Sequence, residues 1–291
     1  MKNLSILLFL LFVSFTASSQ SCLPQGITFS TQADVDNFHI NYPNCTQIGG
    51  SVYIVNTSIS NLNGLNVLTS IGGLLQIWYN MHLISLSGLD NVTQIGGALI
   101  IQYNFALTNL SGLKGLTQIG GDFTYFSNGL ITNLSGLDKL TYVGGTLKIT
   151  DCCLSSLTGL GKLDHIGGYL WLENNYALTN LSGLDSLNSI GNYLWIHNNY
   201  ALTSLTGLDK LNSIGGGLTI HANHNIHSLS GLDNIDAGSI THLNIDSNQN
   251  LTVCTVQSIC DYITSPTGFV SIHTNAIGCN NQAEVEAACA I

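Results

Sequence analysis

The fold is decided by a phrase that runs Ile190-Gly191-Asn192-Tyr193-Leu194-Trp195-Ile196-His197-Asn198-Asn199 and continues to Leu205-Thr206-Gly207-Leu208-Asp209. The same pattern recurs along most of the chain. Its opening element, Ile-Gly-Gly in most copies, returns every 23 or 24 residues, beginning at Ile48, Ile71, Ile95, Ile119, Val143, Ile166, Ile190 and Ile214. A fixed period of this length is typical of solenoid proteins, in which each repeat packs only against its neighbours.

Within each repeat, the Leu-x-Ile element alternates apolar and other residues with a period of two. This alternation predicts a short strand whose Leu and Ile point inward and whose intervening residues point outward. Each repeat should therefore supply one parallel strand, and a ninth strand follows at Leu243-Asn244-Ile245. A second recurrent glycine, as at Gly207, precedes a Leu, and we expect it to turn a corner with a positive φ.

Five residues after the first apolar strand position comes an asparagine. A buried amide at a repeated turn can bond backbone groups of the adjacent rungs that would otherwise stay unpaired. We interpret the column as a structural asparagine ladder, broken by Thr57 in the first rung and Cys152 in the fifth. Its members are Asn80, Asn104, Asn128, Asn175, Asn199, Asn223 and Asn248.

The N-terminus has the layout of a signal peptide. Lys2 is followed by an apolar run from Leu4 to Phe15 and a small polar stretch, so we expect residues 1–19 to be removed on export. No later segment reaches the ~18 uninterrupted apolar residues of a membrane helix, so no transmembrane segment is predicted.

The charge pattern excludes one class of partner. The chain has 16 Asp and Glu residues against six Lys and no Arg, and losing Lys2 changes the net charge from −10 to −11. Binding to nucleic acid needs clustered basic residues that neutralise phosphates, and this sequence lacks them. All eight cysteines lie beyond the signal peptide, and an even number in an exported chain indicates disulfides.

The Ile-Gly-Gly-x-Leu-x-Ile and Leu-Ser-Gly-Leu phrases resemble the receptor L-domain family, especially its secreted, leucine-rich-repeat-like members of Bacteroidetes type. The resemblance covers nearly the whole mature chain. It implies an all-β, right-handed parallel β-solenoid with disulfide-bonded N- and C-terminal caps. We expect an N-terminal cap at residues 20–47, about nine rungs at residues 48–250, and a C-terminal cap at residues 251–291.

The caps are also where the resemblance places disulfides. It implies that Cys22 pairs with Cys45 in the first cap. For the second cap we favour Cys254 with Cys279 and Cys260 with Cys289, although four cysteines allow three pairings. A short helix is expected from Val256 to Ile263. Cys152 and Cys153 have no other cysteine within a rung, so they form either a strained vicinal disulfide or two thiols, and we favour a buried structural role.

The outward positions form two columns along the predicted sheet. Neighbouring parallel strands lie ~4.8 Å apart, so successive members of a column should touch. Aromatic rings there could bind a glycan or anchor a protein, or could simply stabilise the sheet. The candidate ligand-binding residues are Trp78, Phe126, Trp171 and Trp195.

The second column also contains the one set of residues with metal-ligand chemistry. Four successive rungs offer a carboxylate, two imidazoles and a carboxylate, which could share a divalent ion or simply pair with one another. These residues are Glu173, His197, His221 and Asp246. A further column of Asp follows the corner glycine, as at Asp185 and Asp209; it could collect Ca²⁺, but a solvated corner is the favoured interpretation.

Apart from residues explained by the repeat pattern, the sequence shows no catalytic set of a nucleophile, a base and a group that orients the base. We therefore expect no enzymatic activity and no cofactor. The sequence predicts a non-catalytic binding protein, located outside the cell, at its surface or in the periplasm, which recognises an extracellular protein or glycan through its outward strand face. The alternatives are a structural or adhesive part of the cell envelope and, with less support, a carbohydrate-active β-solenoid enzyme.

Overall fold

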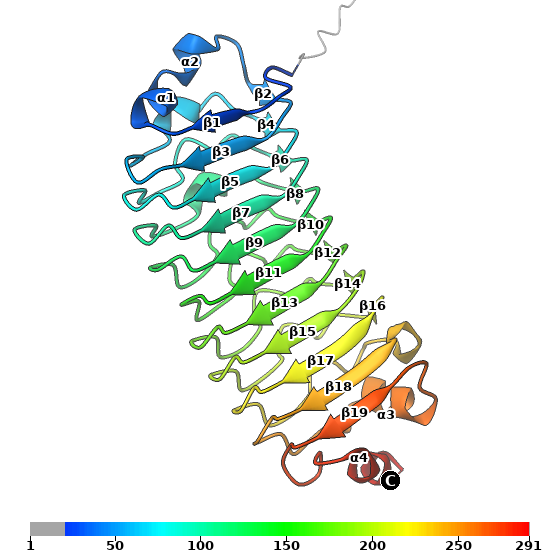
Figure 1. Ribbon diagram of the computed structural model, residues 1–291. Coiled ribbons are helices and arrows are strands. Elements are labelled where there is room, and N and C mark those ends of the chain that lie inside the picture. The colour runs from blue at the N-terminus through cyan, green and yellow to red at the C-terminus, as the bar shows by residue number, and fades with distance from the viewer. Residues whose placement is uncertain (1–20, 291) are drawn as a thin grey trace, which may run out of the picture.

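The computed structural model describes residues 21–290 and forms one elongated solenoid (Figure 1). The expected signal peptide lies outside the described residues. Two parallel sheets run the length of the solenoid, and the fold expected from the repeat is thereby confirmed. The longer sheet, which faces the viewer in Figure 1, contains eleven strands in the order β1 (Ile27–Phe29), β3 (Val52–Val55), β5 (Leu75–Trp78), β7 (Leu99–Gln102), β9 (Phe123–Phe126), β11 (Leu147–Thr150), β13 (Leu170–Glu173), β15 (Leu194–His197), β17 (Gly217–His221), β18 (His242–Asp246) and β19 (Val270–His273).

A second sheet was not expected, because the sequence indicated one strand per rung. Eight rungs contribute a further strand of two residues, which ends at the Ile or Val that begins the Ile-Gly-Gly phrase. This sheet contains β2 (Gln47–Ile48), β4 (Ser70–Ile71), β6 (Gln94–Ile95), β8 (Gln118–Ile119), β10 (Tyr142–Val143), β12 (His165–Ile166), β14 (Ser189–Ile190) and β16 (Ser213–Ile214). Two-residue strands are too short to show an alternating pattern, which is why the sequence did not reveal them.

The core is a continuous column of Leu and Ile side chains between the two sheets. The inward residues of each long strand, such as Leu194 and Ile196, are fully buried, as are the Leu residues of the Leu-x-x-Leu segment. Rungs approach so closely that glycine is required at the corners. A Cβ atom on Gly207 would lie 2.1 Å from the carbonyl oxygen of Leu181, one rung earlier.

The expectation of a positive φ at the corner glycines is met at six of the eight positions: Gly88, Gly136, Gly159, Gly183, Gly207 and Gly231. It is wrong at Gly64 and Gly112, where the chain forms the short 3-10 helices η1 (Asn63–Leu65) and η2 (Ser111–Leu113). A Cβ on Gly112 would still lie 1.9 Å from the carbonyl oxygen of Leu86. Close approach of the backbone, rather than one conformation, is therefore what all these corners share.

The asparagine column forms a hydrogen-bonded ladder. The backbone N–H of Asn80 donates to Oδ1 of Asn104 at 3.1 Å, and Asn104 repeats this with Asn128 at 3.0 Å. Each Nδ2 also donates to a strand carbonyl of the preceding rung, as from Asn104 to Ile77 at 2.9 Å. The ladder has one member that the sequence did not indicate. Asn275 lies in the C-terminal cap and accepts from the backbone N–H of Asn248 at 3.0 Å.

The solenoid is closed at both ends. Over the first rungs lie α1 (Gln32–Asp36) and α2 (Phe38–Asn41), with Cys22 bonded to Cys45. At the other end α4 (Gln282–Cys289) packs against β19, and α3 (Gln257–Thr264) packs against α4 and η3 (Ala237–Ser239). The disulfides there join Cys254 to Cys279 and Cys260 to Cys289, the pairs that we favoured. In residues 21–290, no helix has the length and apolarity needed to cross a membrane.

The break at Cys152 leaves a defect in the ladder. Its thiol lies 2.9 Å from the carbonyl oxygen of Thr150, but Oδ1 of the next member, Asn175, is buried without a hydrogen-bond partner. An unpaired buried acceptor costs on the order of 1–3 kcal/mol.

We therefore expect Cys152→Asn to raise the free energy of unfolding by about 1–3 kcal/mol, because the new amide would donate to Asn175 as the other members do. Urea denaturation followed by circular dichroism measures the change. Cys153→Asn, at the exposed neighbouring position, is the control and should leave the stability unchanged. Equal stability of the parent and Cys152→Asn would contradict this account of the ladder.

Candidate functional site on the long sheet

The outward columns of the long sheet are in register. Trp171 lies opposite Trp195, and along the second column Glu173 lies opposite His197, which lies opposite His221 and then Asp246. The sheet divides into two halves that differ in chemistry. From β11 onward it presents the ionisable residues Lys148, Glu173, His197, His221, Asp246 and His273. From β1 to β9 the outward positions are uncharged and rich in aromatic residues.

Trp171 and Trp195 stack as expected, with ring centroids 5.4 Å apart and planes inclined by 29°. Nζ of Lys148 lies 4.3 Å from the Trp171 ring centroid, and the indole N–H of Trp171 donates to Oε2 of Glu173 at 2.9 Å. Both tryptophans are partly buried. Because these contacts cover much of the Trp171 ring, the pair offers less open ring surface than the sequence suggested.

The other two predicted binding residues belong to a larger group that the sequence did not reveal. We call this group the aromatic cluster; it consists of Trp78, Tyr79, Tyr103, Phe105 and Phe126. Its neighbouring rings meet at steep angles, from 60° for Tyr103 with Phe105 to 89° for Tyr103 with Phe126. Trp78 is 40% exposed, Tyr79 47% and Phe105 42%. This cluster lies where β5, β7 and β9 end and turn.

Two members of the aromatic cluster occupy a strained backbone position. The residue before each ladder asparagine has a left-handed conformation, and in most rungs it is Asn, Asp, Ser or another small residue. In the second and third rungs it is Tyr79 (φ 60°) and Tyr103 (φ 57°). A bulky residue in this region costs on the order of 1–3 kcal/mol, and such strain tends to collect at functional positions.

The proposed metal ligands lie in one line but do not surround one point. Nδ1 of His221 bonds Oδ2 of Asp246 at 2.7 Å, while Nδ1 of His197 lies 3.2 Å from Oε1 of Glu173 without hydrogen-bond alignment. Residues 21–290 contain no group of three or more His, Cys, Asp and Glu placed to hold a metal ion. The rung spacing spreads the four side chains along the solenoid, so they form two pairs instead.

Burial lowers the pKa of His197, and the nearby His221 lowers it further, although Glu173 and Asp246 oppose these effects. The two imidazole rings meet edge to face, with centroids 4.5 Å apart. The structure therefore favours neutral His197 at the centre of this polar half of the sheet.

The Asp column at the corners has a local structural role. Each carboxylate accepts a hydrogen bond from the N–H of the corner glycine two residues earlier, for example Asp185 from Gly183 at 2.8 Å and Asp209 from Gly207 at 2.9 Å. This bond explains the recurrence of Asp without a bound cation. One member, Asp90, also pairs with Lys114 at 3.0 Å, and its pKa is lowered, first by the Gly88 N–H.

Two shallow pockets open on the long sheet. The first, about 300 Å³, is lined by Thr28, Tyr53, Val55, Gln76 and Trp78 and adjoins the aromatic cluster. A second, about 260 Å³, lies at the boundary between the two halves and is lined by Gln102, Thr124, Phe126, Lys148, Thr150, Asp151 and Glu173. Ligand sites of small molecules usually measure ~300–1,000 Å³, so each pocket could hold only part of a larger ligand.

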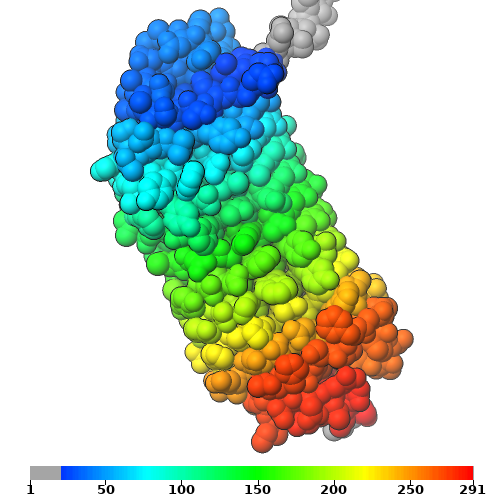
Figure 2. Space-filling model, viewed as in Figure 1, coloured from blue at the N-terminus to red at the C-terminus, as the bar shows by residue number. Residues whose placement is uncertain are grey.

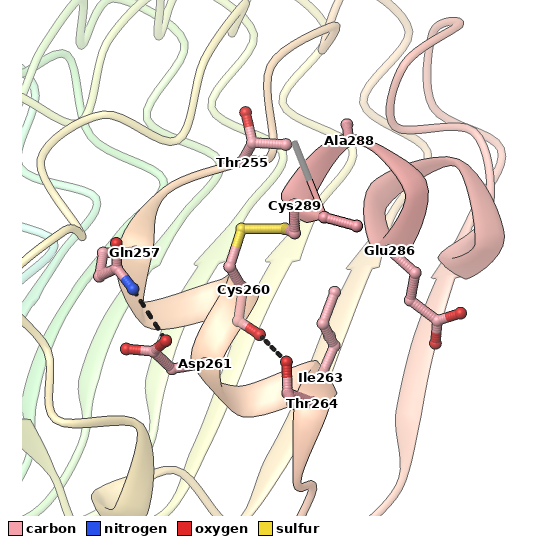
Figure 3. Close-up of a pocket in the computed structure, with 10 residues that line it drawn as sticks. Thr255, Gln257, Cys260, Asp261, Ile263, Thr264, Glu286, Ala288 and Cys289 are labelled. Carbon is pink, nitrogen blue, oxygen red and sulfur yellow. Dashed lines mark hydrogen bonds between the residues drawn. A yellow bond between two sulfur atoms is a disulfide. The ribbon is translucent and has the colours of Figure 1, made fainter.

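A larger pocket, about 530 Å³, lies in the C-terminal cap between α3 and α4 (Figure 3). The Cys260–Cys289 disulfide crosses it. Its polar groups are bonded to one another, with Gln257 donating to Asp261 at 2.8 Å and Thr264 to the Cys260 carbonyl at 2.8 Å. This pocket is therefore a gap between cap helices rather than a set of converging ligands.

Comparison with known proteins does not identify a family. No protein-family model matches the chain, and none of the curated proteins matches it. A solved structure with some similarity is the crystal structure of the TLR13-ssRNA13 complex, at 14% identity and a TM-score of 0.34. The match covers 88% of this chain and 44% of that one, so this chain spans less than half of its length. Such a likeness supports neither a shared family nor a shared ligand.

The lowered pKa of His197 predicts a loss of stability in mild acid. A histidine whose pKa is lower in the folded chain stabilises the fold above its unfolded pKa of ~6.5, and this contribution is lost as the pH falls below that value. The melting temperature should therefore decrease from pH 7 to pH 5.5, and His197→Gln should reduce the decrease. The exposed His227, changed to Gln, is the matched control. An identical pH profile for His197→Gln and the parent would refute the prediction.

The state of the vicinal cysteines gives a second prediction. Cys152 is buried, burial raises its pKa to about 12, and Cys153 is exposed; neither is in a disulfide. Alkylation without a reductant should modify one residue, Cys153, in the folded protein and two in urea. Mass spectrometry counts the modified residues. No modification in urea would show a vicinal disulfide instead.

Proposed function

We propose that this protein is an exported, non-catalytic binding protein of the receptor L-domain type, which recognises an extracellular protein or glycan through the outward face of its long sheet. The observation that carries the proposal is the partly exposed aromatic cluster on a framework of paired parallel strands. Aromatic side chains are the residues most enriched where binding energy is concentrated, and a rigid sheet holds them in place before a ligand arrives.

Export is supported by the disulfides and by the N-terminal sequence. Three disulfides lock the two caps, and structural disulfides persist mainly in oxidising compartments outside the cytosol. The pattern of Lys2 followed by an apolar run agrees with this location.

A binding role is favoured over catalysis by the way the carboxylates are used. Asp151 and Glu173 line the pocket at the boundary between the halves. Asp151 accepts from Asn174 at 3.1 Å, and Glu173 accepts from the Trp171 indole at 2.9 Å. A glycosidase needs a carboxyl group that donates a proton and a second one that attacks or activates water, placed on either side of the bound sugar. These two carboxylates line only a shallow pocket of about 260 Å³.

The proposal predicts that binding depends on outward aromatic residues. We expect the parent protein to bind on an array of glycans or purified extracellular proteins, and at least one of two double variants, Trp78→Ala/Phe126→Ala and Trp171→Ala/Trp195→Ala, to bind at least tenfold more weakly. Loss of one hot-spot residue, ~2 kcal/mol or more, is sufficient for this effect.

Circular dichroism of both variants controls for folding. Equal binding by the parent and the two variants, or no binding by the parent, would contradict a ligand site on this face. Release of reducing ends from a bound glycan over time would show an enzyme.

A further inference from the structure

We propose that the aromatic cluster is a binding site for a neutral glycan, an uncharged chain of pyranose sugars, which lies along the turns that follow β5, β7 and β9. The inference rests on the proposed function and deepens it, because it names one ligand class and one half of the long sheet. In Figure 2 this half is the light-blue to green part of the face turned to the viewer.

The first support is the scarcity of charge around most of the aromatic cluster. Only Phe126 borders charged side chains, in the pocket that it lines with Lys148, Asp151 and Glu173. Between residues 48 and 126 the only Asp, Glu, Lys or Arg residues are Asp90, Lys114 and Asp122. Asp90 and Lys114 pair with each other, and Asp122, just before β9, accepts from the Thr146 N–H at 2.7 Å. No outward position from β1 to β9 carries a charge. Away from Phe126, a charged glycan, or a protein that docks through charged groups, would find few partners for its ions here.

The second support is the orientation of the rings. Stacked rings, as in the Trp171–Trp195 pair, cover one another's faces. In the aromatic cluster the rings meet at 60–89° instead, and Trp78, Tyr79 and Phe105 stay 40%, 47% and 42% exposed. A pyranose ring has an apolar face of C–H groups that packs on an aromatic face. Successive rungs repeat every ~4.8 Å, a spacing comparable to the length of one sugar in an extended chain.

The third support is a set of polar groups that can bond sugar hydroxyls. Gln76 and Gln102 point outward beside Trp78. Both side chains are partly exposed. Gln76 lines the pocket of about 300 Å³ with Tyr53 and Trp78, and Gln102 lines the pocket beside Phe126. Each amide offers both donors and an acceptor, which suits hydroxyl groups.

The fourth support is the strain at Tyr79 and Tyr103. The same left-handed position holds Asn174 and Asn198 in later rungs, where the side chain suits the conformation better. Tyr79 is exposed and Tyr103 is half-buried, and the aromatic contacts of both rings are with other members of the aromatic cluster. A contribution to binding accounts for the presence of both tyrosines.

The test uses the whole mature protein and measures dissociation constants by isothermal titration calorimetry. The probes are neutral polysaccharides, namely galactomannan, xyloglucan and mixed-linkage β-glucan, and charged ones, namely polygalacturonate and alginate. We expect binding to at least one neutral probe, and at least tenfold weaker binding by Trp78→Ala and by Tyr79→Asn. The melting temperature of Tyr79→Asn should be no lower than that of the parent, because the substitution relieves strain.

Tyr176→Asn is the control, since this residue lies on the charged half, and it should bind within twofold of the parent. Trp171→Ala distinguishes the two halves of the sheet. Binding to charged probes alone, or binding lost in Trp171→Ala and kept in Trp78→Ala, would overturn this inference and leave the proposed function intact. Binding of a purified protein but of no glycan would do the same. A marked fall in the melting temperature of Tyr79→Asn, absent in Tyr176→Asn, would show that the tyrosine holds the fold, which also overturns it.

Discussion

Each rung of the solenoid bends sharply where its long strand ends, and the bend buries backbone donors and acceptors that water cannot reach. The asparagine ladder satisfies them, because one side chain accepts from its own neighbour in the column and donates to a strand carbonyl of the preceding rung. An unpaired buried group costs enough free energy that this requirement constrains every rung. The period of about 24 residues, the parallel register and the stacked Leu core all depend on bringing the next asparagine to the same place.

Because the ladder and the inward Leu and Ile residues hold the fold, the outward residues of the long sheet are free to vary. The chain uses this freedom differently in its two halves. Toward the C-terminus, charged and stacked side chains pair with one another, as Lys148 does with Trp171 and His221 with Asp246. Toward the N-terminus, uncharged aromatic rings meet edge to face, and Trp78, Tyr79 and Phe105 stay partly exposed. Surface that is not occupied by contacts within the protein is the surface that remains for a ligand.

The sequence was sufficient to predict the architecture because the same kinds of residue return at the same positions in eight successive rungs. Strand positions, ladder and corner residues follow from the alternation and from the recurrent Asn and Gly. The short second sheet and Asn275 were missed because two residues show no period and because the C-terminal cap lacks the Ile-Gly-Gly phrase. The predicted outward columns included two members of the aromatic cluster, Trp78 and Phe126. They did not include Tyr79, Tyr103 and Phe105, because an alternating pattern predicts side-chain direction in strands but not in the turns that follow them.

The orientation of the aromatic rings also could not be predicted from the sequence, and it affects how much of each ring is exposed. Register predicts that Trp171 and Trp195 are adjacent, and it is correct. Adjacency in a column, however, brings flat rings face to face, so it hides the surface that a ligand would use. The left-handed backbone after the strand changes this geometry. The rings of Tyr79 and Tyr103 meet their neighbours at 66° and 89° rather than face to face. In this solenoid, the bulky residues at a turn position that small residues occupy in most rungs therefore mark the place where aromatic rings stay exposed.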